Sequence, residues 1–221
     1  MIIRKYGLEL REIEREDLEM IRQYRNSTLI RNKMIYRKII SRLEQKKWFE
    51  SIRNHTNAYY LIYKDDIAMG LINGKNIDHQ NKTSEGGIFI WHEDANYEVT
   101  ILASIILNDW NFSFNNFNFN FAEVLKSNKK AIAYNEFMGY KISEKEHGNE
   151  YVLWMEQSKA DYIKFREKVV RLKLIDFDVT EPLSYKDLII EPSEIEFRKS
   201  LIKHLPQEQR EMYLNLIQQH L

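Results

Sequence analysis

The sequence has no cysteine, and only seven glycines and three prolines among its 221 residues. The absence of cysteine excludes disulfides, thiolate nucleophiles and cysteine-bound metals, and it is typical of a cytoplasmic protein, which we expect here. The scarcity of glycine and proline argues against long flexible linkers, so we expect most of the chain to be ordered.

Net charge is also lacking, because 33 lysines and arginines balance 33 aspartates and glutamates. Without a net positive field, nucleic acid is not an expected partner. The longest apolar stretches, such as residues 101–107, are far shorter than the roughly 20 residues that cross a bilayer. The N-terminus carries Arg4 and Lys5 and no apolar block of signal-peptide length, so we expect no membrane partner.

Apolar periodicity predicts an α/β domain over residues 1–157. We expect, in chain order, a strand at 7–13, helices at 18–26 and 42–54, three strands between 58 and 94, a helix at 100–112, a strand at 117–125, a helix at 129–138 and a closing hairpin at 139–156. The order β-α-α-β-β-β-α-β-α-β-β predicts a mixed, mainly antiparallel central sheet flanked by helices.

The second helix has a capping signal, since Ser41 and Glu44 have the Ser-x-x-Glu spacing in which each side chain binds the other's backbone amide. We expect this helix to bury Leu43, Trp48 and Ile52. Phe49 is also expected in the core because it shares their helical spacing.

Two further segments carry burial expectations. The helix at 100–112 should bury one face through Ile101 and Ile105 and expose the other through Asn108 or Asp109. The strand that follows should bury an aromatic face, made of Phe117, Phe119 and Phe121. The alternative for this asparagine-rich stretch is a low-complexity loop.

Residues 158–221 have a different character, with a charged amphipathic helix from about residue 158 and two more helices after Ser193 and near Pro206. We therefore divide the chain into a domain at 1–157 and a C-terminal helical extension at 158–221. These helices should pack on their own domain or on a second subunit, which would make a homodimer.

The segments LELREIEREDLEMIRQYRN and SNKKAIAYNEFMGYK resemble the GCN5-related N-acetyltransferase (GNAT) family over residues 1–157. Asn128, Ala131, Gly139 and Tyr140 match the family's N-x-x-A and G-F/Y signature. Within the family the likeness is to bacterial enzymes that acetylate amino sugar nucleotides or protein N-termini. The resemblance implies an acetyl-CoA donor and a small-molecule amine as acceptor.

The resemblance also implies a donor cleft between two splayed strands. The backbone of Phe89, Ile90 and Trp91 would bind the pantetheine arm on one side, and residues 124–128, including Asn128, would bind it on the other. Backbone pairing requires no particular side chain, so this half of the donor site tolerates sequence change.

The diphosphate half of the donor site departs from the family's R/Q-x-x-G-x-G/A loop. Counting back from Asn128 places that loop at residues 95–100, where no glycine stands. Glu98 would set a carboxylate beside the diphosphate, at a cost on the order of one to several kcal/mol. Thr100 could still cap the next helix and leave its amides free to bind phosphate.

Candidate acid and base residues follow from the same resemblance. Asn135 stands where the family often has the tyrosine that protonates the leaving thiolate, and Tyr134 is one residue earlier, about 100° away on a helix. We take Tyr134 as the candidate acid. Glu85 is the candidate base for the amine, with His92 and Glu93 as alternatives.

Arg25 and Asn26 end the first helix, which forms one wall of the acceptor site in the family, and Arg31 follows them. Arginine can bind a phosphate or carboxylate there through two parallel donors. The six histidines, at positions 55, 79, 92, 147, 204 and 220, show no paired spacing for a metal, and we expect none.

Two functions fit these features. The first is an N-acetyltransferase that uses acetyl-CoA, which the signature favours. The second is a binding or assembly protein that has kept the fold, lost the donor site and works through its C-terminal helices. A related enzyme with a donor carrying less phosphate is a third possibility.

Overall fold

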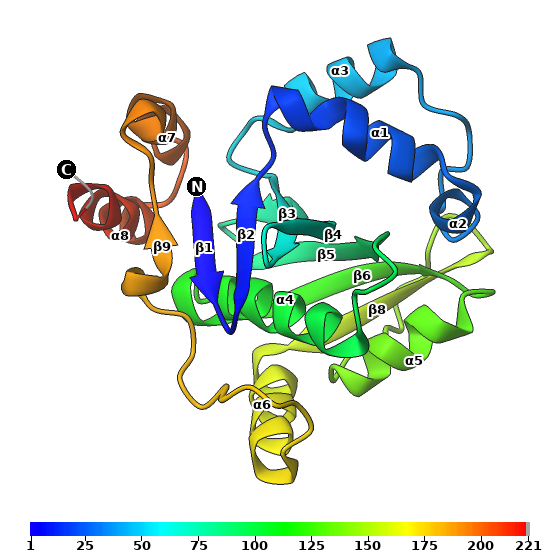
Figure 1. The fold of residues 1–221 in the computed structure, drawn as a ribbon. Coiled ribbons are helices and arrows are strands. Elements are labelled where there is room, and N and C mark those ends of the chain that lie inside the picture. The colour runs from blue at the N-terminus through cyan, green and yellow to red at the C-terminus, as the bar shows by residue number, and fades with distance from the viewer. Residues whose placement is uncertain (220–221) are drawn as a thin grey trace.

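A computed structural model describes residues 1–219 and shows one nine-stranded sheet within them, in the order β7-β8-β6-β5-β4-β3-β2-β1-β9 (Figure 1). The strands are β1 (Ile2–Lys5), β2 (Leu8–Glu12), β3 (Ala58–Lys64), β4 (Ile67–Asp78), β5 (Thr83–Ile90), β6 (Phe119–Leu125), β7 (Lys141–Ile142), β8 (Val152–Ser158) and β9 (Leu188–Ile189). Of the strand pairs in these residues, β5 and β6 alone are parallel. The predicted mixed, mainly antiparallel sheet is confirmed.

Helices cover both faces of this sheet (Figure 1). They are α1 (Leu18–Asn26), α2 (Thr28–Arg31), α3 (Arg42–Ile52), α4 (Tyr97–Asp109), α5 (Lys129–Phe137), α6 (Lys159–Leu172), α7 (Ile195–Ile202) and α8 (Gln207–Gln218). Helix α4 continues as a π-helical turn over Trp110–Phe114. The predicted element order is present, and the chain adds β1, α2 and β9 to it.

Each face of the sheet has its own apolar cluster. On one face, Ile21 of α1 and Phe49 of α3 pack with Leu61 and Leu71 of the central strands. On the other face, α4 lies in the centre of a larger cluster, which alternate residues of the same strands, such as Ile62, join. This alternation is the period of two that strand geometry imposes.

Two local signals in the sequence are confirmed. The Ser41 hydroxyl accepts from the Glu44 amide at 3.2 Å, and the Glu44 carboxylate accepts from the Ser41 amide at 2.7 Å. Gly139 ends α5 with φ +94°, and a Cβ added there would lie 3.1 Å from the carbonyl oxygen of Asp161. The positive φ favours glycine at this position, and a side chain would also require the Asp161 backbone to shift by a few tenths of an ångström.

The buried side of α3 differs from the expectation at one residue. Phe49 is buried and Trp48 and Ile52 pack partly against the same cluster, but Leu43 is 62 % exposed. The prediction for Leu43 was wrong, since this residue of the first turn of α3 does not belong to the cluster.

The aromatic face predicted for β6 is wrong as well. Phe117 is buried but precedes the strand, whereas Phe119 is 39 % exposed and Asn120 is almost fully buried. The Asn120 amide donates to the Asn108 side chain at 3.0 Å and to the Tyr140 hydroxyl at 2.7 Å. These hydrogen bonds offset the cost of burying an amide, so the asparagine can face inward.

Helix α4 has no solvent-exposed face of the kind predicted from Asn108 and Asp109, since both residues are buried. The Asp109 carboxylate receives hydrogen bonds from Arg166 at 2.5 Å, from the Tyr162 hydroxyl at 2.7 Å and from the Leu183 amide at 3.0 Å. All three donors come from the C-terminal segment, which covers the side of α4 that was expected to face water.

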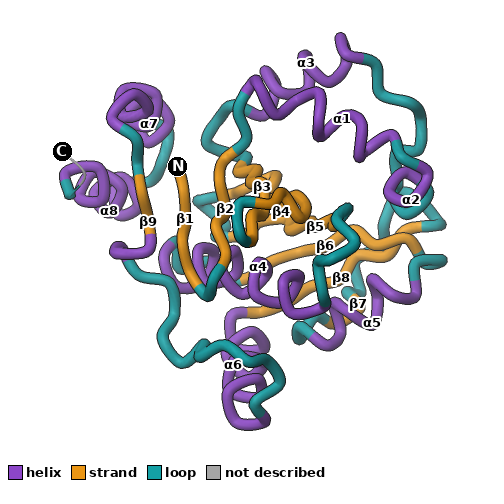
Figure 2. Tube along the Cα trace, viewed as in Figure 1, coloured by secondary structure: helices purple, strands orange, loops and turns teal. Residues whose placement is uncertain are grey.

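The C-terminal segment also extends the sheet. Strand β9 pairs with β1, with Ile189 opposite Ile2 and Leu188 opposite Ile3. A long loop joins α6 to this strand (Figure 2). Buried side chains of α6, α7 and α8 belong to the same cluster as α4. The division of the chain at residue 157 as two separate units stays a prediction.

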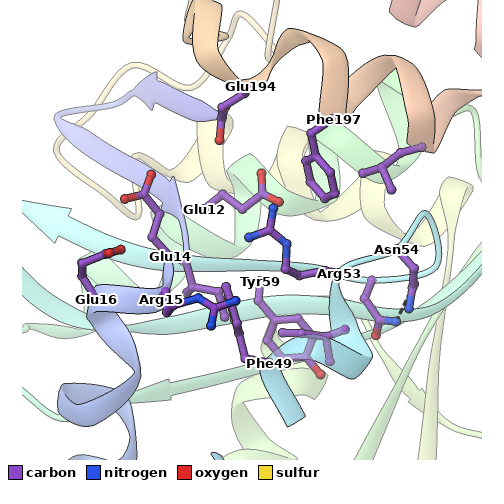
Figure 3. A pocket seen from close by; sticks show the side chains of 14 residues that line it. Glu12, Glu14, Arg15, Glu16, Phe49, Arg53, Asn54, Tyr59, Glu194 and Phe197 are labelled. Carbon is purple, nitrogen blue, oxygen red and sulfur yellow. Dashed lines mark hydrogen bonds between the residues drawn. The ribbon is translucent and has the colours of Figure 1, made fainter. Parts of the chain in front are cut away.

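A second contact joins α7 to the N-terminal strands around a cavity of about 230 Å³ (Figure 3). The guanidinium of Arg53 lies 4.4 Å from the ring centre of Phe197 on α7 and 5.4 Å from that of Phe49. The Met1 amino group lies 2.6 Å from the Glu194 carboxylate. Two carboxylates of this wall, Glu12 and Glu194, are paired with the Met1 amino group and Arg198, which join β1 and β2 to α7.

Candidate functional site

Strands β5 and β6 separate part of the way along their length. Thr83, Ser84 and Glu85 pair with residues 119–121, and the pairing then stops although β5 continues to Ile90 and β6 to Leu125. Backbone groups on the facing edges of residues 86–90 and 122–125 are thus not bonded to each other. Phe89, Ile90 and Trp91 lie along one side of this opening and residues 124–128 along the other, and their role in binding a donor stays a prediction.

The side chains along this part of β5 are used for packing. The Trp91 indole stacks on Tyr24 with ring centres 4.7 Å apart, and its nitrogen donates to the Ala68 carbonyl at 2.8 Å. Phe89 packs beside Trp91, and Ile90 faces the opposite cluster. The Trp91 amide donates to the Met69 carbonyl at 3.0 Å, so it is not free to bind a ligand in the opening.

Asparagine caps both helices at the opening. Asn128 begins α5, and its side chain accepts from the Ala131 amide at 3.2 Å. Asn96 begins α4 in the same way, accepting from the Val99 amide at 3.0 Å. The expectation that Thr100 caps this helix is wrong, because α4 starts at Tyr97 and Thr100 lies inside it.

The segment predicted as the diphosphate loop is therefore mostly helix. The true connection from β5 to α4 covers residues 91–96, which contain Glu93 and Asp94 and no glycine. The count from Asn128 misplaced it because the π-helical turn after α4 lengthens the intervening chain. The N-terminus of α4 still offers its dipole to a diphosphate, without the glycines that let backbone amides wrap it.

Glu98 lies in the first turn of α4, and its carboxylate accepts from the Asp176 amide at 2.7 Å. Its charge is thus held by the loop that follows α6. This contact places the C-terminal segment directly beside the helix terminus at which a diphosphate would bind.

Tyr134 lies on α5 and reaches α4. Its hydroxyl is 2.7 Å from the Ser104 hydroxyl and 3.1 Å from the Thr100 carbonyl oxygen. Burial raises its pKa above the usual value for tyrosine, which favours the protonated form that an acid needs. Asn135 is turned away, because its amide donates to the Ala131 carbonyl within α5. The role of Tyr134 stays a prediction.

Glu85 belongs to a group of charged side chains at the point where the strands separate. The Lys75 ammonium of β4 lies 2.9 Å from the Glu85 carboxylate and 2.6 Å from that of Glu123 on β6. Asn76 donates to Glu85 at 2.9 Å, and the His147 ring nitrogen Nε2 is 3.0 Å from Glu123. Three neighbouring strands and the loop before β8 contribute to this group.

The hydrogen bonds in this group fix its charges. Burial raises the pKa of Glu123, but hydrogen bonds from Lys75 and His147 outweigh it and leave the pKa below its usual value. The His147 atom Nδ1 accepts from the Asn149 amide at 2.9 Å, which assigns the proton of a neutral ring to Nε2. Two carboxylates against one ammonium give a net negative charge, which attracts a cationic amine.

Sequence reasoning missed Lys75, Glu123 and His147. The available signal was a charged residue inside each of two strands, Lys75 in β4 and Glu123 in β6. Their proximity depends on strand register, which the sequence alone does not provide.

The acceptor residues predicted in α1 hold a neighbouring loop. The Asn26 side chain both donates to and accepts from the backbone of Ile40 at 2.8 Å. Arg25 donates to the Tyr36 carbonyl at 2.9 Å, and its Nη1 has no hydrogen-bond partner in the described part of the chain. Their role as substrate ligands stays a prediction.

The alternative bases lie apart from this group. His92 is 3.8 Å from the Asp94 carboxylate in the connection to α4, and Glu93 beside it is exposed. His220 lies outside the described residues. Within residues 1–219 no three side chains of histidine, aspartate or glutamate are placed to hold a metal ion, and no helix is long and apolar enough to cross a bilayer.

Solved structures of two kinds of acetyltransferase resemble this fold. Spermidine N-acetyltransferase from Vibrio cholerae, in complex with CoA and spermine, matches with a TM-score of 0.60 and 19% identity, over 72% of this chain and 99% of that one. Apo FdhC, a nucleotide-linked sugar GNAT, matches with a TM-score of 0.65 and 18% identity, over 77% and 97% of the two chains. At these identities the likeness concerns the fold.

No curated protein sequence matches the chain. A family model described as an acetyltransferase (GNAT) domain matches residues 10–154, which span β2 to β8 and contain both the strand opening and the charged group beside it. Acetyl-CoA is the co-substrate of that family. The chain therefore belongs to the GNAT family of acetyltransferases.

Proposed function

We propose that this protein transfers an acetyl group from acetyl-CoA to the amine of a small molecule such as an amino sugar nucleotide. The observation that carries the proposal is the end of β5–β6 pairing at Glu85 and Phe121, directly beside Lys75 and Glu123. In this proposal the opening between β5 and β6 binds the donor, and the negatively charged group beside it binds the amine.

In this scheme acetyl-CoA supplies a thioester whose carbonyl carbon the neutral amine attacks. Backbone groups of residues 86–90 hold the pantetheine arm and stabilise the negative charge that develops on the carbonyl oxygen. The amine proton passes to Glu85 or Glu123, directly or through water. As the C–S bond breaks, the departing sulfur takes a proton, for which Tyr134 is the candidate source.

Two features support a phosphorylated amine as the acceptor. The net negative charge of Lys75, Glu85 and Glu123 favours an ammonium group. Arg25 has an unpaired guanidinium nitrogen on the helix expected to line the acceptor site, and arginine binds phosphate well. Among the similar structures, one enzyme acetylates spermidine and another is a nucleotide-linked sugar GNAT, so these two acceptor classes are the ones to compare.

Calorimetric titration with acetyl-CoA tests the donor site. We expect saturable binding, and tighter binding by about tenfold or more for Glu98→Gly, which removes a carboxylate from the end of α4 that faces the diphosphate. The rate at which free CoA thiol appears is then measured with an amino sugar nucleotide and with spermidine. The faster reaction identifies the preferred class of acceptor. Absence of binding at millimolar acetyl-CoA in both proteins would refute the proposal.

We also propose that α6 forms a homodimer contact. Ile163 and Val170 lie seven residues apart on α6, and both are exposed. Light scattering on a size-exclusion column should give twice the chain mass, and Ile163→Asp should return it to that of one chain. A monomer at every concentration of the unaltered protein would contradict this contact.

A further inference from the structure

A second cavity, of about 670 Å³, lies where the C-terminal segment meets the far end of β4. Its walls come from the loop before β3, the β4–β5 hairpin and the turn between α7 and α8. Along β4, Gly70 pairs with Ile90 at the strand opening, and Asp78 lies eight residues further on. At about 3.3 Å per residue, roughly 25 Å separate Asp78 from the end of the sheet at Ile90. The near side of the cavity adjoins the charged group, because Asn76 on its wall donates to Glu85 at 2.9 Å.

Basic side chains dominate the wall of this cavity. Lys203 and Arg210 provide two permanent positive charges, and three histidines, His55, His79 and His204, add to them when protonated. The one carboxylate on the wall, Asp78, accepts from the amides of Gln80 and Asn81, both at 2.9 Å, and from the Asn81 side chain at 2.7 Å. Its charge is turned into the hairpin.

The histidines are stacked and do not converge on a point. The rings of His55 and His204 lie 5.0 Å apart at an angle of 17°, and those of His55 and His79 lie 6.4 Å apart. Face-to-face rings cannot direct their nitrogens at one metal ion, in agreement with the absence of a metal-binding group in residues 1–219.

His79 is buried and incompletely bonded. Its side chain is 9 % exposed, and Nε2 lies 3.1 Å from the His55 carbonyl oxygen. The other nitrogen, Nδ1, has no hydrogen-bond partner among the described residues. Burial, opposed by the His55 carbonyl, lowers the pKa of His79, and burial together with His204 lowers the pKa of His55.

We propose that this cavity is a second binding site, which takes a small phosphate-bearing anion between Lys203, Arg210 and the histidine stack. The volume lies within the range of small-molecule sites. An anion there offsets the repulsion of two closely spaced histidines and raises their pKa values, so binding takes up protons. The ligand also joins the α7–α8 turn to the β4–β5 hairpin and should raise the melting temperature.

Binding to the full chain tests the site without reference to acetyl transfer. We expect calorimetry to show that inorganic pyrophosphate binds the unaltered protein. The double variant Lys203→Gln/His204→Gln should bind it with an affinity lower by at least about tenfold. Both side chains are exposed, so the variant should fold. Lys199→Gln is the matched control, because Lys199 lies one turn earlier on α7, where it pairs with Glu196; its affinity should equal that of the unaltered protein.

The pH dependence uses sulfate, which stays a dianion across the range in which histidine titrates. Sulfate should bind more tightly as the pH falls through the range in which the histidines titrate, and His55→Gln should reduce this gain. The charged groups that face the histidines are Asp78, Lys203 and Arg210. Hydrogen bonds from the backbone and side chain of Asn81 lower the pKa of Asp78. ADP, compared with pyrophosphate, distinguishes a nucleotide from a free phosphate anion, and tighter binding of either supports the site.

Two results would overturn the proposal. One is the absence of saturable binding by millimolar pyrophosphate and ADP at pH 6. The other is equal affinity in the double variant, the Lys199→Gln control and the unaltered protein, which would place the anion elsewhere on the molecule.

Discussion

Lys75, Glu85 and Glu123 come from three neighbouring strands, and pairing register brings their charges together. Lys75 is directly opposite Glu85 across β4 and β5. Glu85 pairs with Phe121, and Glu123 lies two residues beyond it on the same face of β6. A shift of one residue in either register would send one of these side chains to the opposite face of the sheet.

Glu123→Gln should therefore lower kcat/KM for acetylation by about a hundredfold, if the carboxylate accepts the amine proton or holds the ammonium. Glu85→Gln should act in the same direction, and comparison of the two identifies the base. Glu150→Gln, an exposed glutamate in the turn before β8, is the control and should leave kcat/KM unchanged. Unchanged kinetics in both active-site variants would remove this charged group from the mechanism.

Asn26 also has its partner in a separate loop. Both polar atoms of its side chain are bonded to the backbone of Ile40, and its role as a substrate ligand stays a prediction. Sequence context identified a polar residue with a structural or functional role, and the position of a loop 14 residues away decided which partner it has.

Helix α4 is the element on which most of the molecule packs. It lies under the central strands and carries Asp109, which binds Arg166 and Tyr162 of α6 and the backbone after the following loop. A carboxylate that is fully buried needs such partners, because desolvation of an unpaired charge is costly.

Asp109→Ala should lower the free energy of unfolding by about 3–5 kcal/mol, because it leaves the Arg166 charge without its partner. Denaturant unfolding measures the change. Adding Arg166→Met should restore part of the loss, since the unpaired charge is then removed. Asp176→Asn is the control, because Asp176 is exposed in the loop that follows α6. It should change the free energy of unfolding by less than about 0.5 kcal/mol. A small effect of Asp109→Ala alone would contradict the importance of this pair.

At the scale of the whole molecule, the two ends of the chain are held together. The Met1 amino group contacts Glu194, and Glu12 of β2 pairs with Arg198 of α7. Strand β9 closes the same edge of the sheet against β1. The N-terminal strands and the C-terminal helices therefore stabilise each other.

Acid should weaken this contact between the N-terminal strands and the C-terminal helices. Burial raises the pKa of Glu12, but Arg198 and the N-terminal amino group outweigh it, so the folded-state pKa lies below the ordinary 4.5. A carboxyl with a lowered pKa stabilises the fold fully above about pH 4.5, and this contribution is lost as the pH falls through the folded-state pKa.

Melting curves from pH 7 down to pH 3 measure the effect. Glu12→Gln should melt lower than the unaltered protein at pH 7, and the two melting temperatures should converge toward pH 3. Glu16→Gln, which changes an exposed glutamate near the same cavity, should melt like the unaltered protein at both ends. If the difference in melting temperature between Glu12→Gln and the unaltered protein stayed constant across this range, ionisation of Glu12 would not stabilise the contact between β2 and α7.

The sequence by itself determined the element order and several boundaries, because these depend on local signals. The capping residues Ser41 and Asn128 and the helix-ending Gly139 act on backbone groups within a few residues of themselves. Together with the N-x-x-A and glycine signature, they were sufficient to identify the family.

Tertiary structure alone decided which polar residues are buried and which charges meet. Asn120 and Asp109 face inward because partners far along the chain satisfy them, and no period in the local sequence records those partners. The group around Lys75 depends on strand register, and the histidine-lined cavity depends on where the α7–α8 turn docks. Both are non-local contacts, which the chain makes only when the whole sheet has assembled.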